Sequence, residues 1–272
     1  MTGTGRVAVA GGTVYEVDGI GPTLVLVHGL GMNRFMWDWQ WDALRARFCV
    51  VRYDLLGHGE SAKPRRPYSM EDFVDQLLGL AEALKLKRFA LVGFSLGGLI
   101  AQAFTLAHPG RAAALAILNA AHDRTEAQRA AVRARVAQAA AEGPAATVEA
   151  ALGRWFTEDF AARRPEVIER VRQWILANDP AVYPAAYRVL AEADAPLAKA
   201  IEAIGCPTLI ITGEDDRGNA PAMARRMAGL IPGARAEILP GLRHMALAED
   251  PEAVAALLIP FLEGVSGRPG RP

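Results

Sequence analysis

Ser95 stands at the centre of the clearest chemical pattern in the chain, Gly93-Phe94-Ser95-Leu96-Gly97. An apolar run over Phe89–Val92 precedes the pattern, and a helical periodicity over 97–107 follows it. A Gly-x-Ser-x-Gly sequence between a strand and a helix is typical of a tight, strained turn that exposes a serine hydroxyl. The pattern therefore predicts that Ser95 is a nucleophile.

A serine hydroxyl is a weak nucleophile unless a general base removes its proton. The chain has five histidines, and His244 lies in a predicted loop between the last strand and the final helix. A loop at the carboxyl end of a strand is where a base can meet a serine on a strand–helix turn. We therefore expect His244 to be the base.

Three consecutive carboxylates, Glu214, Asp215 and Asp216, follow a buried strand and Gly213. In enzymes with a serine on such a turn, the acid lies between the serine and the histidine along the chain. One of the three is expected to hold the histidine in its productive tautomer. Position alone leaves Asp215 and Asp216 as equal candidates.

Acyl transfer also needs donors for the oxyanion that develops on the carbonyl. Two backbone N–H groups are candidates for this oxyanion hole. One belongs to Leu96, directly after the nucleophile, and the other to Leu30 in the loop His28-Gly29-Leu30-Gly31. The expected chemistry is acyl transfer to water, for which no metal and no organic cofactor is needed.

The elements that position these residues follow from the apolar pattern. Continuous apolar runs at 24–27, 50–53, 89–92, 115–118, 208–211 and 236–239 indicate strands buried on both faces. A hairpin with its turn at Gly11-Gly12 precedes them. Helical periodicity at 71–86, 97–107, 220–230 and 251–262 separates or follows the strands. This alternation predicts an α/β fold with a mostly parallel central sheet flanked by helices.

One interval breaks the alternation. Between about 122 and 195 only helical patterns occur, at 124–142, 145–152, 164–178 and 183–192. A helical insertion after a central strand should pack over the carboxyl ends of the strands, where ligands bind in open α/β sheets. We expect an α/β core of residues 1–121 and 196–272, and a helical cap of residues 122–195.

Five residues near these motifs are candidates for substrate binding: Arg34, Trp37, Phe94, Trp155 and Phe156. The aromatic members predict a mostly apolar pocket. Arg34, close to the oxyanion loop, is the candidate for binding a substrate carboxylate, with an exposed structural arginine as the alternative.

Lys+Arg and Asp+Glu are 30 each, so the formal net charge is zero. No broad electrostatic field favours nucleic acid or an anionic membrane. The start of the chain lacks an apolar leader pattern, no run of eighteen apolar residues occurs, and the two cysteines match no metal spacing. The expected protein is a cytoplasmic enzyme that takes a small molecule, with a homo-oligomer left open.

Together these motifs resemble the α/β-hydrolase superfamily, and the matches span nearly the whole chain. They are His28–Gly31, Asp54–Ser61 (DLLGHGES), Gly93–Gly98, Gly213–Asp216 and Gly241–His244. The resemblance implies that the acid is Asp216, the third residue after Gly213, and that His58 belongs to a structural loop.

Within the superfamily, Gly93–Gln102 (GFSLGGLIAQ) and the insertion around Trp155–Glu166 look like the 3-oxoadipate enol-lactonase and carboxylesterase branch. The resemblance implies hydrolysis of an ester or lactone through an acyl-enzyme on Ser95. The alternatives are a hydrolase of carbon–carbon bonds in ring-fission products, a cofactor-free perhydrolase or haloperoxidase, and a non-hydrolytic ligand receptor.

Overall fold

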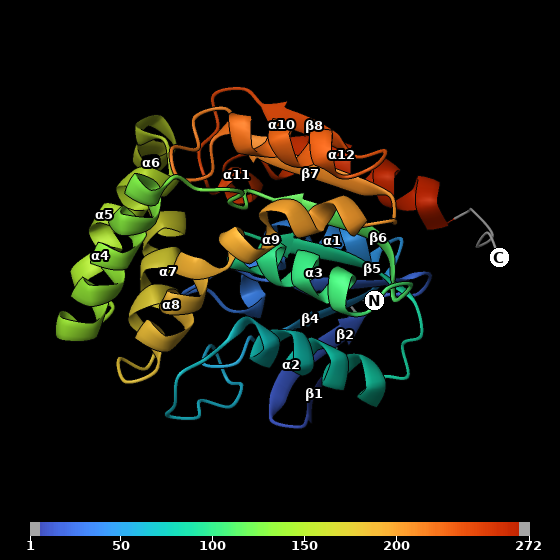
Figure 1. Cartoon of the computed structure of the whole chain (residues 1–272), viewed down its shortest axis with the longest axis horizontal. Coiled ribbons are helices and arrows are strands. Elements are labelled where there is room, and N and C mark those ends of the chain that lie inside the picture. Colours follow the sequence, from blue (N-terminus) through green and yellow to red (C-terminus); the bar gives the residue numbers. More distant parts are fainter. Residues whose placement is uncertain (1–5, 267–272) are drawn as a thin grey trace.

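A computed structural model describes residues 6–266 and contains one eight-stranded sheet (Figure 1). The strands are β1 (Arg6–Ala10), β2 (Thr13–Asp18), β3 (Thr23–Val27), β4 (Cys49–Tyr53), β5 (Phe89–Phe94), β6 (Ala112–Leu118), β7 (Thr208–Gly213) and β8 (Arg235–Leu239). Their order across the sheet is β1-β2-β4-β3-β5-β6-β7-β8. β2 pairs antiparallel with β1 and β4, and all other pairs are parallel. The expected α/β fold with a mostly parallel sheet is confirmed.

Helices cover both faces of the sheet, which is why the central strands β3, β5 and β6 are almost entirely apolar. Leu24 and Leu26 of β3 join a core cluster with α1 (Asp38–Arg45), α11 (Ala246–Glu249) and α12 (Pro251–Ser266). Val25 and Val27 point the opposite way, into a cluster with α2 (Met70–Ala83), α3 (Leu96–Ala107), α9 (Asp194–Ala200) and α10 (Pro221–Leu230). Successive residues of a strand face opposite sides, so each face of the sheet has its own core.

The first two strands form the expected hairpin. Ala10 pairs with Thr13, so the connection contains only Gly11 and Gly12. Their φ angles are 53° and 80°, which glycine adopts without steric cost. The hairpin forms the antiparallel edge of an otherwise parallel sheet.

Five helices lie between β6 and α9: α4 (Glu126–Glu142), α5 (Ala145–Trp155), α6 (Glu158–Arg163), α7 (Pro165–Leu176) and α8 (Tyr183–Glu192). We call this segment the helical insert. Thr125 and Gln128 form a capping box at the start of α4, and Gly143 ends that helix with a φ of 82°. In Figure 1 the insert forms a separate layer, in green to yellow, beside one end of the sheet.

The sequence analysis did not predict two short 3-10 helices. The segment after the His28–Gly31 loop forms a 3-10 turn, η1 (Arg34–Trp37), and η2 (Ile201–Ala203) follows α9. Helical segments of three or four residues are too short to show the helical periodicity of apolar residues in the sequence. Within residues 6–266, no helix is both long and apolar enough to cross a membrane.

Candidate active site

Ser95 connects the end of β5 to the start of α3 with a φ of 52° and a ψ of −113°. This is the left-handed side of conformational space, which residues other than glycine adopt only under strain. A Cβ on Gly93 would lie 2.2 Å from the Gly97 carbonyl oxygen, and one on Gly97 would lie 2.2 Å from that of Val27. Both flanking positions therefore need glycine, and the serine is held at a sharp corner.

His244 and Asp216 form a buried pair. His244 lies between β8 and α11, and its Nδ1 is 2.7 Å from Oδ2 of Asp216, the third residue after β7. Asp215 is exposed. The structure thus places Asp216, and not its neighbour, against the histidine. A proton on Nδ1 donated to this carboxylate leaves Nε2 as an acceptor.

Two asparagines, which the sequence analysis missed, complete the surroundings of Asp216. Asn119 Nδ2 donates to Oδ2 at 3.0 Å, while the backbone N–H groups of Gly218 and Asn219 donate to Oδ1 at 3.0 and 2.9 Å. The Asn219 side chain donates to the Asn119 carbonyl at 2.7 Å and lies 3.2 Å from His244 Nδ1. A position directly after a buried strand was the available signal for Asn119.

These contacts decide the protonation state of Asp216. Burial alone would raise the pKa of Asp216, but His244, Asn119 and the Asn219 N–H outweigh that cost and hold it below its ordinary value. The carboxyl group is therefore ionised at neutral pH. An ionised partner both orients the imidazole and stabilises the imidazolium that forms when the base takes a proton.

Ser95, Asp216 and His244 line the same cavity, of about 90 Å³. Of the predicted substrate-binding residues, Phe94 and Trp155 also line it. The ring centroids of Phe94 and Trp155 lie 5.0 and 5.7 Å from that of His244. The helical insert contributes part of the wall, including Arg135, Arg154, Tyr183 and Tyr187.

The two predicted oxyanion donors are available for a ligand. Within residues 6–266, neither the Leu30 N–H nor the Leu96 N–H has a hydrogen-bond acceptor. Leu96 is the first residue of α3, where the N–H groups have no intrahelical partner, and Leu30 lines the cavity. Unpaired backbone N–H groups are rare inside proteins, so this arrangement is suited to a bound oxygen.

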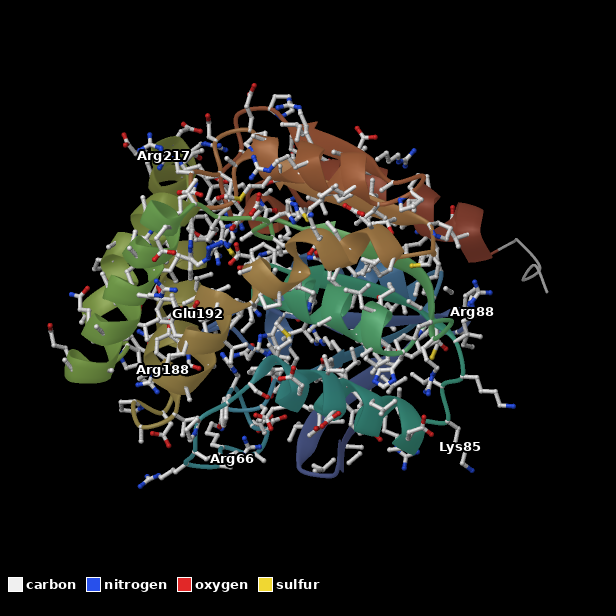
Figure 2. The ribbon with its side chains drawn as sticks, viewed as in Figure 1. Arg66, Lys85, Arg88, Arg188, Glu192 and Arg217 are labelled. Carbon is white, nitrogen blue, oxygen red and sulfur yellow. The ribbon has the colours of Figure 1, made fainter. Side chains whose placement is uncertain are left out.

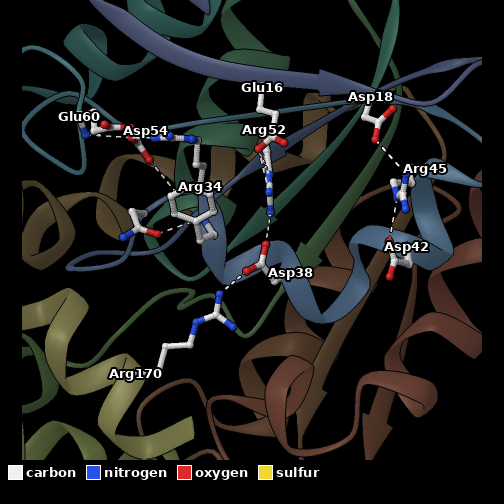
Figure 3. A network of polar contacts seen from close by, with 12 residues as sticks. Glu16, Asp18, Arg34, Asp38, Asp42, Arg45, Arg52, Asp54, Glu60 and Arg170 are labelled. Carbon is white, nitrogen blue, oxygen red and sulfur yellow. Dashed lines mark hydrogen bonds and ion pairs between the residues drawn. The ribbon is translucent and has the colours of Figure 1, made fainter. Parts of the chain in front are cut away.

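Arg34 is not where the sequence analysis placed it. Its side chain is buried and does not line the cavity. Its Nη1 lies 2.5 Å from Asp54 Oδ2, and its Nη2 lies 2.5 Å from Glu60 Oε2, as Figure 3 shows. The expectation that Arg34 binds a substrate carboxylate is wrong, because two carboxylates of the chain itself already neutralise it. The exposed-arginine alternative is wrong as well.

Trp37 and Phe156 also lie outside the cavity wall. Both are almost fully buried in the core cluster that contains α1 and α12. Phe156 stacks on Phe160, with ring centroids 5.6 Å apart. An apolar side chain close in sequence to a site residue can be buried in the core instead of in the pocket. Trp37 and Phe156 are buried in the core, away from the cavity.

Two other histidines have structural roles. His28 Nδ1 lies 2.8 Å from the Gly29 carbonyl and its Nε2 accepts from the Leu55 N–H at 2.9 Å. His58 lies edge-on to His28, with ring centroids 5.3 Å apart. Burial lowers the pKa of His28 to about 4 and that of His58 to about 3, so both stay neutral.

A strained serine between strand and helix, and a histidine–carboxylate pair on later loops of the same sheet, are the features of an α/β hydrolase. Residues 24–257 match the Alpha/beta hydrolase family, and the chain belongs to that family. It is 32% identical over 249 residues to the (E)-2-((N-methylformamido)methylene)succinate hydrolase of Acinetobacter baylyi, covering 92% of this chain and 93% of the relative.

The similarity extends to 3-oxoadipate enol-lactonase 2 of Acinetobacter baylyi, which is 28% identical over 85% of each chain. Among solved structures, the enol-lactonase from Burkholderia xenovorans LB400 has a TM-score of 0.88 and 33% identity, covering 95% of this chain and 100% of that one. A thermophilic esterase from Thermogutta terrifontis, solved with malate bound, has a TM-score of 0.87 and 30% identity, covering 97% and 99%. The resemblance to the enol-lactonase branch is confirmed.

Proposed function

We propose that the protein is a serine hydrolase that cleaves a carboxylic ester or lactone through an acyl-enzyme on Ser95. The observation that carries the proposal is the meeting of Ser95 with the His244–Asp216 pair at one cavity. The Asp216 bond leaves His244 Nε2 free to take the serine proton, which a hydroxyl needs before it can attack a carbonyl.

In the proposed first half-reaction, the Ser95 oxygen bonds to the carbonyl carbon while His244 takes the hydroxyl proton. The tetrahedral oxyanion is stabilised by the N–H groups of Leu30 and Leu96, each worth roughly 3 kcal/mol in comparable sites. The carbon–oxygen bond then breaks, and His244 gives its proton to the alkoxide that leaves. For a lactone that alkoxide stays attached to the acyl group.

In the second half-reaction, His244 removes a proton from water, and the resulting hydroxide attacks the acyl-enzyme. Collapse of the second tetrahedral intermediate breaks the bond to Ser95, and His244 returns the proton to its oxygen. We propose that the helical insert acts as a cap that encloses these steps, since its side chains form part of the cavity wall. Enclosure excludes bulk water and strengthens each electrostatic contact.

The names of the relatives support this class of reaction and suggest a second one. An enol-lactonase acts on a cyclic ester, whereas the 32% identical relative is named as a hydrolase of a formamido-substituted succinate. A nucleophilic serine with the same oxyanion donors can also cleave an amide carbonyl. Amide cleavage is therefore the second candidate, and carbon–carbon cleavage is a further outcome of the test.

The experiment compares wild type with Ser95→Ala on p-nitrophenyl esters, saturated lactones, enol-lactones, N-acyl enamines and a ring-fission diketone. Alanine keeps the strained backbone conformation and removes only the hydroxyl. We expect ester and lactone hydrolysis that the variant loses, together with labelling of the wild type alone by a fluorophosphonate probe. Equal rates in both proteins on every substrate, with no difference in labelling, would contradict the proposal. Turnover of only the enamine or the diketone would assign the alternative bond.

A further inference from the structure

Two arginines of the helical insert line the cavity without a carboxylate partner in residues 6–266. Arg135, on α4, donates from Nε to the Tyr187 hydroxyl at 3.2 Å and makes no ion pair with any described residue. The Arg154 side chain, on α5, makes neither a hydrogen bond nor an ion pair with the residues that the structure describes. Both side chains are partly buried. They therefore carry positive charge into a confined space, and no carboxylate of the described chain compensates it.

Arg124, the third arginine of the cavity wall, differs from these two because its charge is paired with a carboxylate. Arg124 donates from Nη1 to Asp194 Oδ1 at 3.1 Å, and Asp194 is fully buried. Asp194 also accepts from the Arg124 backbone N–H at 2.7 Å and lies 3.7 Å from Arg129. The charge of Arg124 is thus neutralised within the protein.

The other ionisable groups at the cavity do not neutralise the remaining pair. Asp216 is the one carboxylate that lines this cavity in the described chain, and it is bound to His244. Burial, and to a smaller extent the proximity of Arg135, lower the pKa of Arg154. A guanidinium still remains charged at neutral pH. The free cavity therefore holds two charges that repel each other.

An unpaired charge in a desolvated site is costly, and the cost falls when an anion binds. A guanidinium presents parallel N–H donors that match the two oxygens of a carboxylate. On the basis of the proposed hydrolysis at Ser95, we propose that Arg135 and Arg154 bind a carboxylate of the substrate, so that the natural substrate is an anionic ester or lactone. The carboxylate lies on the side of the insert, away from the carbonyl that Ser95 attacks.

This assignment explains why the insert, and not the sheet, supplies the positive charge. Placed beside Ser95, a substrate carboxylate would meet Asp216 and the developing oxyanion, both negative. Placed at α4 and α5, it meets the two guanidinium groups and orients the scissile carbonyl at a distance. Binding energy from a remote group of this kind can be used to position the reacting atoms.

The test uses two matched substrates, 4-nitrophenyl pentanoate and the mono-4-nitrophenyl ester of glutaric acid, which differ by a terminal methyl or carboxylate. The variants are Arg135→Gln and Arg154→Gln. The control is Arg188→Gln, whose side chain is exposed on α8 at the outside of the insert (Figure 2). We expect wild type to favour the anionic ester in kcat/KM. Each cavity variant should lose at least about tenfold on that ester and less than about threefold on the neutral one.

No preference in wild type, or an equal loss on both esters in the cavity variants, would overturn the anion site. If Ser95→Ala still removes ester hydrolysis with either of these outcomes, the proposed function is supported and only the anion site is contradicted. If no ester is cleaved, calorimetry of glutarate with Ser95→Ala decides the matter. Binding that Arg135→Gln and Arg154→Gln each weaken at least about tenfold supports the site. No binding, or equal binding of inorganic phosphate, counts against a carboxylate site.

Discussion

The backbone N–H of Met245 donates to the carbonyl of Trp155 at 2.9 Å, which joins the histidine loop directly to the helical insert. Arg243 adds two bonds to the same segment, from Nη1 to the carbonyls of Gly153 and Phe156 at 3.0 and 2.7 Å. The residues on both sides of His244 are therefore tied to the end of α5. The position of the proposed base depends on the insert as well as on the sheet.

Glu249 reinforces this connection and is the residue to test it. One carboxylate oxygen accepts from the N–H and hydroxyl of Thr157, both at 2.7 Å, and the other accepts from the Arg243 N–H at 2.8 Å. We expect Glu249→Ala to slow fluorophosphonate labelling of Ser95 about tenfold, since bonds to a charged acceptor contribute ~1.5–3 kcal/mol each. Glu252→Ala, on the exposed start of α12, is the control. Equal labelling rates would show that the base is positioned without Glu249.

Asn119→Ala removes a donor from the proposed catalytic acid. Its amide is 3.0 Å from the Asp216 oxygen that also contacts His244. Loss of this bond should raise the pKa of Asp216 and lower kcat about tenfold at neutral pH. The acid limb of the pH–rate profile should move upward, because the carboxyl group then gains its proton at a higher pH. A profile of unchanged shape would mean that Asn119 supports only the backbone of the loop.

Arg34→Met tests the correction made for that residue. The substitution leaves the fully buried Asp54 without its guanidinium, which should reduce the free energy of unfolding by about 3–5 kcal/mol. Adding Asp54→Asn should recover part of the loss, because the uncompensated charge is removed. Chemical denaturation measures both effects. The preference for anionic over neutral esters should not change. A large change would contradict the correction and indicate that Arg34 binds the substrate.

The buried histidines make the protein sensitive to mild acid. In the unfolded chain a histidine gains a proton below about pH 6.5, whereas burial keeps folded His28 and His58 neutral down to about pH 4 and 3. The unfolded state then binds more protons, so stability falls as the pH drops from about 6.5 towards 4. His58→Asn should make this slope shallower by up to ~1.4 kcal/mol per pH unit. At pH 8 the His58 side chain is neutral in both the folded and the unfolded state. Denaturation at that pH therefore measures only the packing cost of the substitution.

Local patterns were sufficient for much of the fold and for the residues proposed as catalytic. The turn around Ser95 is defined by glycines two positions away, and the buried strands are continuous apolar runs, so neither needs information from elsewhere in the chain. The direction of a side chain does need it. Arg34 lies a few residues from the predicted oxyanion loop, yet its charge is matched by Asp54 and Glu60, which are 20 and 26 positions away.

The arginines of the insert were missed for the same reason. Arg135 and Arg154 occur in arginine-rich amphipathic helices, where a positive residue usually faces solvent. Arg133, two positions before Arg135, does so and pairs with Glu126 and Glu192. Only the packing of α4 against α5 and α8 shows which arginines face the cavity. Asn119 was missed because an asparagine after a strand is common in ordinary turns.

The backbone conformation of Ser95 lowers the stability of the folded protein. Its backbone angles suit glycine, and holding a serine there costs about 1–3 kcal/mol that the rest of the fold must offset. Folding alone therefore favours glycine at position 95. Under the proposed function, only the need for a nucleophilic oxygen favours serine there, so this one position sets folding stability against activity.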